Sequence, residues 1–450
     1  MTLIDLTAPS VQQRRFDTLP VAIIGAGPVG LAAAANLVER GIDFVVYEAG
    51  DQVASSIRQW GHTRLFSPWK HVVDPASRRL LEATGWQLPA PESLPMGTEL
   101  VERYLEPLAA LDEIGGRIRT GVQVEAITRQ GMDRTRTARR ASTPFLLRAR
   151  TVAGVEEFTA RAVIDTSGTY AHPNTLASSG LDPLGLADVA DRVSHALPDV
   201  LGRERDRFAG RHTTVVGAGH SAANTLLALA ELAEQEPDTR ITWLIRNAGA
   251  VRVTTSEDDG LAARASIGRR VDALVAAGRI AVVDRFEIVR LGRTDDGVRL
   301  IGARRGEPVK HHTDVVVSAT GFRPDLDMLR EIRLELDEIV EAPKRLAPLI
   351  DPNVHTCGTV EPHGFAELTH PEPGFFLAGM KSYGRAPTFL LATGYEQVRS
   401  ITAWLAGDLA AASDVELVLP ETGVCSTSLA PDGSSCGTSE GTSAASSCCS

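Results

Sequence analysis

A pattern of apolar strand, glycine turn, helix and second apolar strand occurs twice in the 450 residues, and no other feature constrains the fold as much. The first copy runs from Val21 to Tyr47 and the second from Thr213 to Ile245. Such a unit places a glycine turn before the amino end of a helix, where backbone N–H groups and the helix dipole favour a bound phosphate. The two copies therefore predict two dinucleotide-binding units.

The first copy fits the fingerprint G-x-G-x-x-G, with an acidic residue at the end of the second strand. The first glycine permits a tight turn, the second lets the backbone approach a pyrophosphate, and the third allows close packing of the helix. The acid accepts hydrogen bonds from ribose hydroxyls. The residues expected to bind this cofactor are Gly25, Gly27, Pro28, Gly30 and Glu48.

The second copy has Ala222 at the third position, which the fingerprint allows. Ser221 can add a hydrogen bond to a phosphate, and the position that carries an acid in an NAD site is Arg246. A guanidinium there suits the 2′-phosphate of NADPH, although an arginine that only ends a surface strand is the alternative. The residues expected to bind NADPH are Gly217, Gly219, Ser221 and Arg246.

A chain with two such sites usually joins a bound flavin to an exchanging nicotinamide, so FAD is expected at the first. Val315–Val317 and Phe375–Ala378 read as further buried strands beyond the second copy. We therefore expect an α/β fold with two Rossmann-like domains, the NADPH-binding domain inserted into the FAD-binding domain. The predicted ranges are 1–200 and 311–420 for the FAD-binding domain, 201–310 for the NADPH-binding domain, and 421–450 for a flexible tail rich in Ser, Thr and Gly.

Composition narrows the function class. Hydrophobic residues make up 43% and charged residues 23%, as in soluble enzymes, and a net charge of −11 without a Lys or Arg run argues against nucleic acid. The sequence has no apolar stretch long enough to predict a membrane span or an export signal. Four of the five cysteines fall after residue 421, so a disulfide-linked core is not expected, and we expect the protein to be located in the reducing cytoplasm. The Arg-rich stretch 129–150 is expected to be a loop or hairpin with a solvated basic face.

Over residues 18–410 the chain resembles the FAD-dependent pyridine-nucleotide oxidoreductases, and among them most closely the flavin-containing monooxygenases. Beyond the glycine motifs, the resemblance rests on Asp165–Gly168 with Pro173 and on Ser318–Asp325, which are similar to the two segments that cross between domains in that family. Gly374–Gly379 is similar to the late strand and turn beside the flavin. The resemblance implies that Gly379, and a helix starting near Thr388, approach the flavin.

The chain also departs from the monooxygenase pattern. The glycine pair and Trp that usually follow the first acid appear only as Ala54–Trp60, and the phenylalanine-glycine-histidine signature is scattered over Gly180, His195 and Phe208–Gly210. No side chain is identified as a general acid or base, and no metal site is predicted.

The cysteines suggest a second chemistry. Two adjacent thiolates can engage one soft centre, and a third sulfur suits trivalent arsenic; the chain also resembles flavoproteins encoded with arsenic-resistance genes. A dispensable tail, an inert buried cysteine and an ordinary basic loop are the alternatives. The candidate substrate-site residues are Cys448, Cys449, Cys425, Cys436, Cys357 and, in the loop Lys381–Arg385, Arg385.

Three functions are weighed. The leading hypothesis is an NADPH-dependent flavin monooxygenase that uses O2 to oxygenate a small soft nucleophile, a sulfur, nitrogen or trivalent arsenic centre. The second is a flavin reductase acting on thiols or on a thiophilic metal or metalloid held by the tail cysteines. The third is a non-catalytic metalloid-binding flavoprotein. The sequence leaves open whether the protein forms a homo-oligomer.

Overall fold

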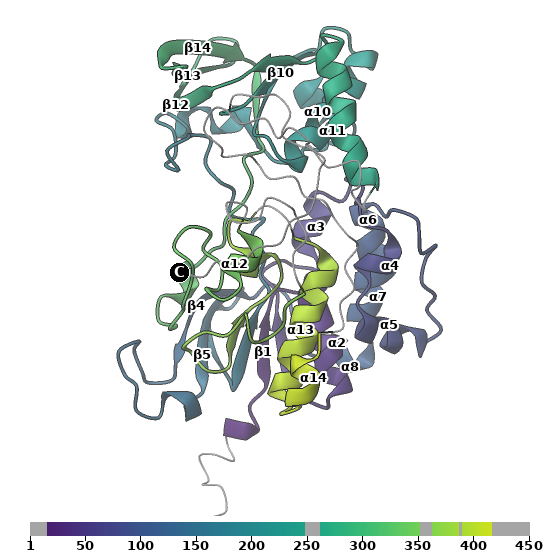
Figure 1. Cartoon of the computed structure of the whole chain (residues 1–450), viewed down its shortest axis with the longest axis vertical. Helices are drawn as coiled ribbons and strands as arrows, with labels where there is room; N and C mark the ends of the chain where they lie inside the picture. The colour runs from purple at the N-terminus through teal and green to yellow at the C-terminus, as the bar shows by residue number, and fades with distance from the viewer. Residues whose placement is uncertain (1–15, 248–261, 352–361, 387–388, 416–450) are drawn as a thin grey trace, which may run out of the picture.

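The computed structural model describes residues 16–247, 262–351, 362–386 and 389–415. Figure 1 shows two parts stacked along the long axis, joined by a narrow region. The lower part contains the first glycine motif and the upper part the second. Each is built on a five-stranded parallel sheet, which confirms the predicted α/β class with two dinucleotide-binding folds.

The first sheet is assembled from segments far apart in the sequence. Its order is β16-β7-β1-β2-β3, all parallel, so the last strand in sequence pairs with a strand more than 200 residues earlier. β1 and β2 have the bounds that the apolar runs predicted. The strands are β1 (Val21–Ile24), β2 (Phe44–Tyr47), β3 (Ile118–Arg119), β7 (Ala162–Asp165) and β16 (Phe375–Leu377).

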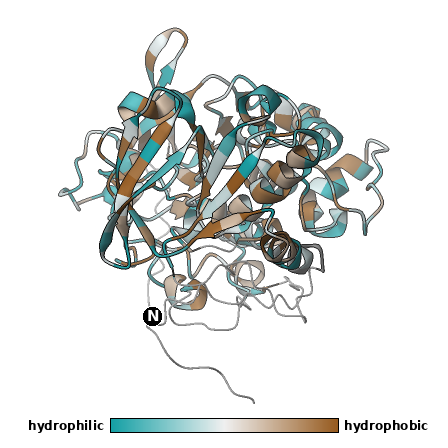
Figure 2. Cartoon of the chain, turned by 90° about the horizontal axis from the view of Figure 1, so that it is seen from above, coloured by the Kyte–Doolittle hydropathy of each residue, from teal (hydrophilic) through white to brown (hydrophobic). Residues whose placement is uncertain are grey.

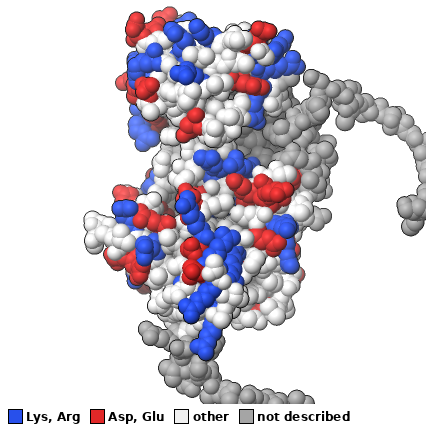
Figure 3. Space-filling model, turned by 90° about the vertical axis from the view of Figure 1, so that its left-hand side faces the viewer, with Lys and Arg blue, Asp and Glu red and all other residues white. Residues whose placement is uncertain are grey.

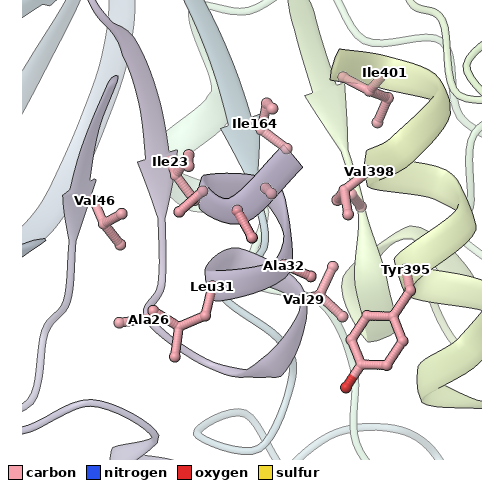
Figure 4. Close-up of a cluster of buried hydrophobic side chains, with 14 of the residues drawn as sticks. Ile23, Ala26, Val29, Leu31, Ala32, Val46, Ile164, Tyr395, Val398 and Ile401 are labelled. Atoms are coloured by element: carbon pink, nitrogen blue, oxygen red, sulfur yellow. The ribbon is translucent and has the colours of Figure 1, made fainter. Parts of the chain in front are cut away.

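Helix α2 (Pro28–Glu39) lies between this sheet and α13 (Leu391–Leu405), as Figure 4 shows. Pro28 starts the helix with its φ preset, and an alanine run gives it high helix propensity and a thin profile. Val29 points toward Tyr395 of α13, and Leu31 lies beside Ala26 (Figure 4); all four side chains belong to one buried cluster. Burial of each large aliphatic side chain contributes about 1.5–3 kcal/mol, so this layer anchors the first turn.

Smaller elements complete the first domain. They are α3 (Ser55–Gln59), α4 (Trp69–Val72), α5 (Pro75–Glu82), α6 (Gly97–Leu100), the π-helical η1 (Val101–Leu105), α7 (Glu106–Ala109), α8 (Asp112–Gly115), η2 (Arg140–Ser142), η4 (Asp327–Leu329), α12 (Ala347–Ile350), η5 (Gly379–Tyr383) and α14 (Leu409–Ser413). A three-stranded antiparallel sheet joins β4 (Gln123–Arg129), β5 (Phe145–Thr151) and β6 (Gly154–Ala160).

The second parallel sheet has the order β11-β10-β9-β15-β8. Its strands are β8 (Val193–His195), β9 (His212–Val216), β10 (Arg240–Leu244), β11 (Ala281–Val283) and β15 (Val315–Ser318). Its helical elements are η3 (Ala187–Arg192), α9 (Arg205–Phe208), α10 (His220–Gln235) and α11 (Ala262–Ala276). An antiparallel sheet of β12 (Phe286–Arg293), β13 (Val298–Arg304) and β14 (Glu307–Thr313) covers its side, and Figure 2 shows hydrophobic and hydrophilic residues following one another along the strand ribbons.

The second sheet is inserted between β7 and β16 of the first, as the sequence predicted. One assignment is wrong: β15 pairs with β9 and β8, so Val315–Ser318 belongs to the second sheet and not to the second part of the first domain. β8 likewise precedes the predicted limit at residue 200. An apolar run identifies a buried strand but not the sheet that it joins. The exact domain limits stay a prediction.

The Arg-rich stretch forms the predicted hairpin, but the expectation that its basic face is solvated is wrong for two of its arginines. Arg129 Nε donates to Glu372 Oε1 at 2.8 Å, and Arg140 Nε donates to Glu372 Oε2 at 2.8 Å. None of these three side chains is more than 3% exposed. The Arg129 guanidinium also lies 3.6 Å from the centre of the Phe145 ring. This cluster ties the hairpin to the segment that precedes β16.

The face seen in Figure 3 carries both basic and acidic residues on each of the two parts. Among the helices of the described ranges, none is long and apolar enough to cross a membrane.

Candidate functional site

The first glycine turn has the geometry that each glycine of the fingerprint requires. Gly25 has φ +97°, a value that disfavours any side chain. A Cβ at Gly30 would lie 1.9 Å from the carbonyl oxygen of Gly25, so only glycine lets the helix approach the turn this closely. At Gly27, by contrast, no heavy atom of the described residues lies within 4 Å of the Cβ position. The backbone there is open to a ligand.

The start of α2 is also open to a ligand. Gly27 caps the helix without any side-chain hydrogen bond, and no acidic residue occupies the first turn. The first N–H groups of α2 therefore keep their partial positive charge for a bound anion. A pyrophosphate fits this arrangement.

Glu48 lies directly after β2 and is 7% exposed. Its Oε2 accepts a hydrogen bond from Ala26 N at 2.7 Å, and its Oε1 accepts from Gly50 N at 2.9 Å and from Ser55 Oγ at 2.6 Å. The carboxylate thus fixes the glycine turn in addition to any contact with a ribose. Sequence reasoning identified Glu48 but missed Ser55, which no fingerprint marks.

A buried ion pair lies beside the first turn. Lys381 Nζ donates to Asp165 Oδ2 at 2.7 Å and to Ser167 Oγ at 3.1 Å, and both charged side chains are fully buried. Asp165 ends β7, which pairs with β1, and the Ser167 Cα is 3.1 Å from a Cβ built on Gly25. Lys381 begins the loop Lys381–Arg385 of the substrate-site prediction, and its side chain lies inside the protein beside the turn.

Gly379 connects the turn to α13. A Cβ at Gly379 would lie 3.3 Å from Val29 at the start of α2, and Gly379 N donates to Gln397 Oε1 at 2.8 Å. Gln397 Nε2 is 2.9 Å from His363 Nε2, so a buried polar chain supports this backbone. The helix α13 begins at Leu391, three residues after Thr388, which lies outside the described residues.

The second glycine turn repeats the plan with different side chains. Gly217 has φ +131°, and a Cβ there would lie 2.0 Å from the carbonyl oxygen of Ala319. Gly219 has open space, and it caps α10 without a side-chain hydrogen bond. Trp243 Nε1 donates to Gly217 O at 2.6 Å and holds the turn against β10.

The two polar residues predicted for the second cofactor lie at the carboxyl edge of the second sheet. Ser221 is half-buried in the first turn of α10, and Arg246 is exposed two residues after β10. Arg246 therefore follows its strand much as Glu48 follows β2. An exposed guanidinium at this edge suits a phosphate that arrives from solvent.

The two predicted crossing segments lie side by side. Asn174 N donates to Gly321 O at 2.9 Å, Thr320 Oγ1 donates to Asn174 O at 2.8 Å, and Pro173 and Phe322 form an antiparallel bridge. One segment leaves the carboxyl end of β7 and the other the carboxyl end of β15. Both glycine turns therefore border the same junction.

A second contact crosses this junction. The ring of Phe66, between α3 and α4 of the first domain, lies 5.7 Å from the ring of His220, the first residue of α10. The amino end of α10 therefore faces the first domain. Two dinucleotides bound at the two turns would approach one another from opposite sides of the junction.

Of the predicted substrate-site residues, Arg385 alone lies within the described residues. Arg385 is exposed, and its Nε pairs with Glu341 Oε2 at 2.6 Å. Cys357, Cys425, Cys436, Cys448 and Cys449 lie outside the described residues. Within the described ranges, no group of three or more His, Cys, Asp or Glu residues could hold a metal ion.

Comparison with known proteins shows which family the sequence matches. A sequence model described as pyridine nucleotide-disulphide oxidoreductase matches residues 22–353. A curated relative, the probable indole-3-pyruvate monooxygenase YUCCA8 of Arabidopsis thaliana, is 30% identical over 219 residues, which are 46% of this chain and 44% of that protein. The chain therefore matches less than half the length of this relative.

Solved structures share the fold. The bacillithiol disulfide reductase Bdr (YpdA) from Bacillus cereus superposes with a TM-score of 0.64 at 19% identity, covering 86% of this chain and 99% of that one. A mutant form of a flavin monooxygenase from Stenotrophomonas maltophilia superposes with a TM-score of 0.55 at 24% identity and with coverage of 86% and 99%. One fold thus serves proteins named as monooxygenases and as disulfide reductases.

Proposed function

The chain belongs to the pyridine nucleotide-disulphide oxidoreductase family, and we propose that this FAD- and NAD(P)H-dependent oxidoreductase is a monooxygenase. Its proposed substrate is a small soft nucleophile, which it oxygenates. FAD and NAD(P)H are typical of the family. We assign FAD to the turn Gly25–Gly30 with Glu48, and NADPH to the turn Gly217–Ala222 with Arg246. Bound FAD would supply hydride acceptance from NADPH and electron transfer onward to O2.

The observation that carries the proposal is the distribution of cysteine. Residues 1–356 contain no cysteine, so the family-matched range 22–353 has no redox thiol to receive electrons from a flavin. An acceptor must therefore come from outside this range, and O2 is such an acceptor. The curated match to an indole-3-pyruvate monooxygenase supports the same direction.

The chain's own residues would bind, orient and shield the cofactors. The open backbone at Gly27 and the uncapped N–H groups of α2 would hold the pyrophosphate of FAD, while the buried Glu48 would accept ribose hydroxyls. Lys381, which is hydrogen-bonded to Asp165 and Ser167, would support the backbone beside this turn. Arg246 would attract the 2′-phosphate of NADPH from solvent.

The test is a balance of electrons. The flavin content of the purified protein is measured first, and the protein is then mixed with NADPH in the presence and in the absence of O2. A thiol, an amine and arsenite are tested as substrates. For each substrate, the NADPH and O2 consumed and the hydrogen peroxide and oxygenated product formed are quantified. We expect NADPH oxidation that requires O2 and yields oxygenated product in equal amount. Sustained NADPH oxidation without O2, coupled to reduction of a disulfide, would contradict the monooxygenase assignment.

A reductase is the second candidate, because the fold also superposes on a bacillithiol disulfide reductase and four cysteines follow residue 421. Electrons would then pass to thiols or to a thiophilic metal or metalloid such as arsenic at Cys425, Cys436, Cys448 and Cys449. Deletion of residues 421–450 separates the two candidates. The reductase loses anaerobic turnover in the shortened chain, whereas the monooxygenase retains its O2-dependent turnover. Metalloid binding without any NADPH oxidation would favour the third, non-catalytic function.

A further inference from the structure

A cavity of about 260 Å³ lies in the second domain, away from its glycine turn. The residues that line it are Asp191, Arg192, Arg207, Arg211 and Val315. Pockets for drug-sized ligands begin at roughly 300 Å³, so this cavity suits a smaller molecule. Three of its five lining residues are arginines.

The strand order explains why the arginines meet. Arg192 immediately precedes β8, Arg211 immediately precedes β9, and Val315 is the first residue of β15. β9, β15 and β8 are parallel neighbours, so their amino ends share one edge of the sheet. Arg207 is added from α9, just ahead of β9.

This edge is the opposite one from the dinucleotide turn. β9 has 5 residues, and Gly217 follows its carboxyl end. A strand rises about 3.3 Å per residue, so roughly 16 Å of strand separates the arginine edge from the turn. The cavity is therefore distinct from the place assigned to NADPH.

The one carboxylate that lines the cavity, that of Asp191, contacts two guanidinium groups. Asp191 Oδ1 is paired with Arg293, which does not line the cavity, and its Oδ2 lies 3.6 Å from Arg192 Nε. Arg207 Nη2 donates to the backbone oxygen of Asp191 at 3.0 Å. The Arg211 guanidinium is exposed and makes no hydrogen bond or ion pair within the part of the chain that the structure describes.

An excess of positive charge in one concavity is unfavourable without a counter-ion, because like charges at close range repel. It stands out in a chain whose net charge is −11. Guanidinium groups present rigid forks of N–H donors that match the oxygens of phosphate and carboxylate in paired hydrogen bonds. Arg192, Arg207 and Arg211 reach the cavity from three different elements, so they can surround an anion.

We infer that this cavity binds a small dianionic oxyanion of the phosphate class, at a site separate from both dinucleotide turns. Arg211 supplies the uncompensated charge, and Arg207 and Arg192 complete the set of donors. The adjoining Asp314 is held at the same edge of the sheet, where its Oδ2 accepts the N–H of His212 at 2.7 Å.

The test is calorimetric titration of inorganic phosphate into the full-length protein with its bound cofactor, in a buffer of low salt. We expect saturable binding that is at least tenfold weaker in Arg211→Ala and lost in the double variant Arg207→Ala/Arg211→Ala. Arg211→Glu gives the sharpest single change, because it reverses the charge of a side chain that makes no hydrogen bond or ion pair among the described residues.

Two matched variants control the result. Arg240→Ala removes an exposed arginine at the amino end of the neighbouring strand β10 and should leave the phosphate affinity unchanged. Arg246→Ala removes the arginine assigned to the 2′-phosphate of NADPH, so it should remove at most a second, separate phosphate-binding event and leave the event at the cavity in place. The inference is overturned if the wild-type protein shows no saturable binding, if the Arg207 and Arg211 variants bind as the wild type does, or if Arg246→Ala abolishes binding.

Discussion

The two glycine turns share a backbone plan but differ in what surrounds them. At the first, Glu48 is 7% exposed and already accepts three hydrogen bonds, and a fully buried Lys381–Asp165 pair lies alongside. At the second, the corresponding strand is followed by an exposed Arg246. The first turn is built into the protein interior, and the second presents its charge to solvent. This difference suits a resident cofactor at one turn and an exchanging cofactor at the other.

The largest expected effect comes from the buried pair. Lys381→Met leaves the Asp165 carboxylate buried without its cation, which costs about 3–5 kcal/mol in the free energy of unfolding. We expect a large loss of thermal stability and of bound flavin, measured by calorimetry and by the absorbance of released flavin. The double variant Lys381→Met/Asp165→Leu should recover much of the stability. Equal losses in the two variants would show that the pair itself is not the cause.

Two partly or fully buried groups, one in each domain, should contribute to the pH dependence of stability with opposite signs. Burial raises the pKa of Asp74, which contacts Asn36 of α2, to about 6 from 3.8. A raised carboxyl pKa gives stability that is present below pH 3.8 and lost as the pH rises through 6, an effect of about 3 kcal/mol. Relative to Asp74→Asn, the wild-type protein should therefore lose stability between about pH 4 and pH 7.

In the second domain, burial lowers the pKa of His311 to about 4 from 6.5. A lowered histidine pKa gives stability that is present above pH 6.5 and lost as the pH falls toward 4. Relative to His311→Gln, the wild-type protein should lose stability as the pH falls from 6.5 to about 4. Unfolding curves of both pairs of proteins over this range measure the two slopes, and slopes of the same sign would contradict the contrast.

The third fingerprint position gives a smaller effect. Gly30→Ala forces a Cβ against the Gly25 carbonyl oxygen, and overpacking of this kind costs about 1–3 kcal/mol. We expect reduced flavin content and a lower melting temperature. The reciprocal change Ala222→Gly, in the second turn, should cost about 1 kcal/mol or less and leave flavin content unchanged.

The smallest effect on stability belongs to Arg246. Arg246→Ala should change the free energy of unfolding by less than about 0.5 kcal/mol, because the side chain is exposed. Its effect on cofactor choice should be tenfold or more: the KM for NADPH rises and that for NADH does not, as steady-state oxidation of the two nucleotides measures. An equal rise for both nucleotides would remove Arg246 from recognition of the 2′-phosphate.

The sequence predicted what is local. The bounds of β1 and β2 follow from two apolar runs, and the turn glycines are needed because Gly25 and Gly217 have positive φ. These features depend on a few neighbouring residues. The insertion of one domain into the other also followed from the order of the strands.

What the sequence did not reveal depends on distant partners. The apolar run Val315–Ser318 has no local mark of the sheet that it joins. From the sequence alone, Arg129 is expected to be a solvated cation, but in the structure it is paired with Glu372, which lies 243 residues away in the sequence. Likewise, 216 residues separate Lys381 from its partner Asp165. Charged residues are mostly exposed, so only the folded structure shows which of them are buried in pairs.

The position of β16 has a consequence for how the protein is made. The strands of the second sheet end at Ser318, but the first sheet lacks an edge strand until Leu377 has been synthesised. Ribosomes add about 5–20 residues per second. The first domain therefore waits for its edge strand β16 for roughly 3–12 seconds after all strands of the second sheet have been synthesised. During that interval the Asp165 carboxylate lacks its partner Lys381, and β7 has an open edge. Chaperone binding to nascent chains should therefore be strongest for chains that end between Ser318 and Leu377.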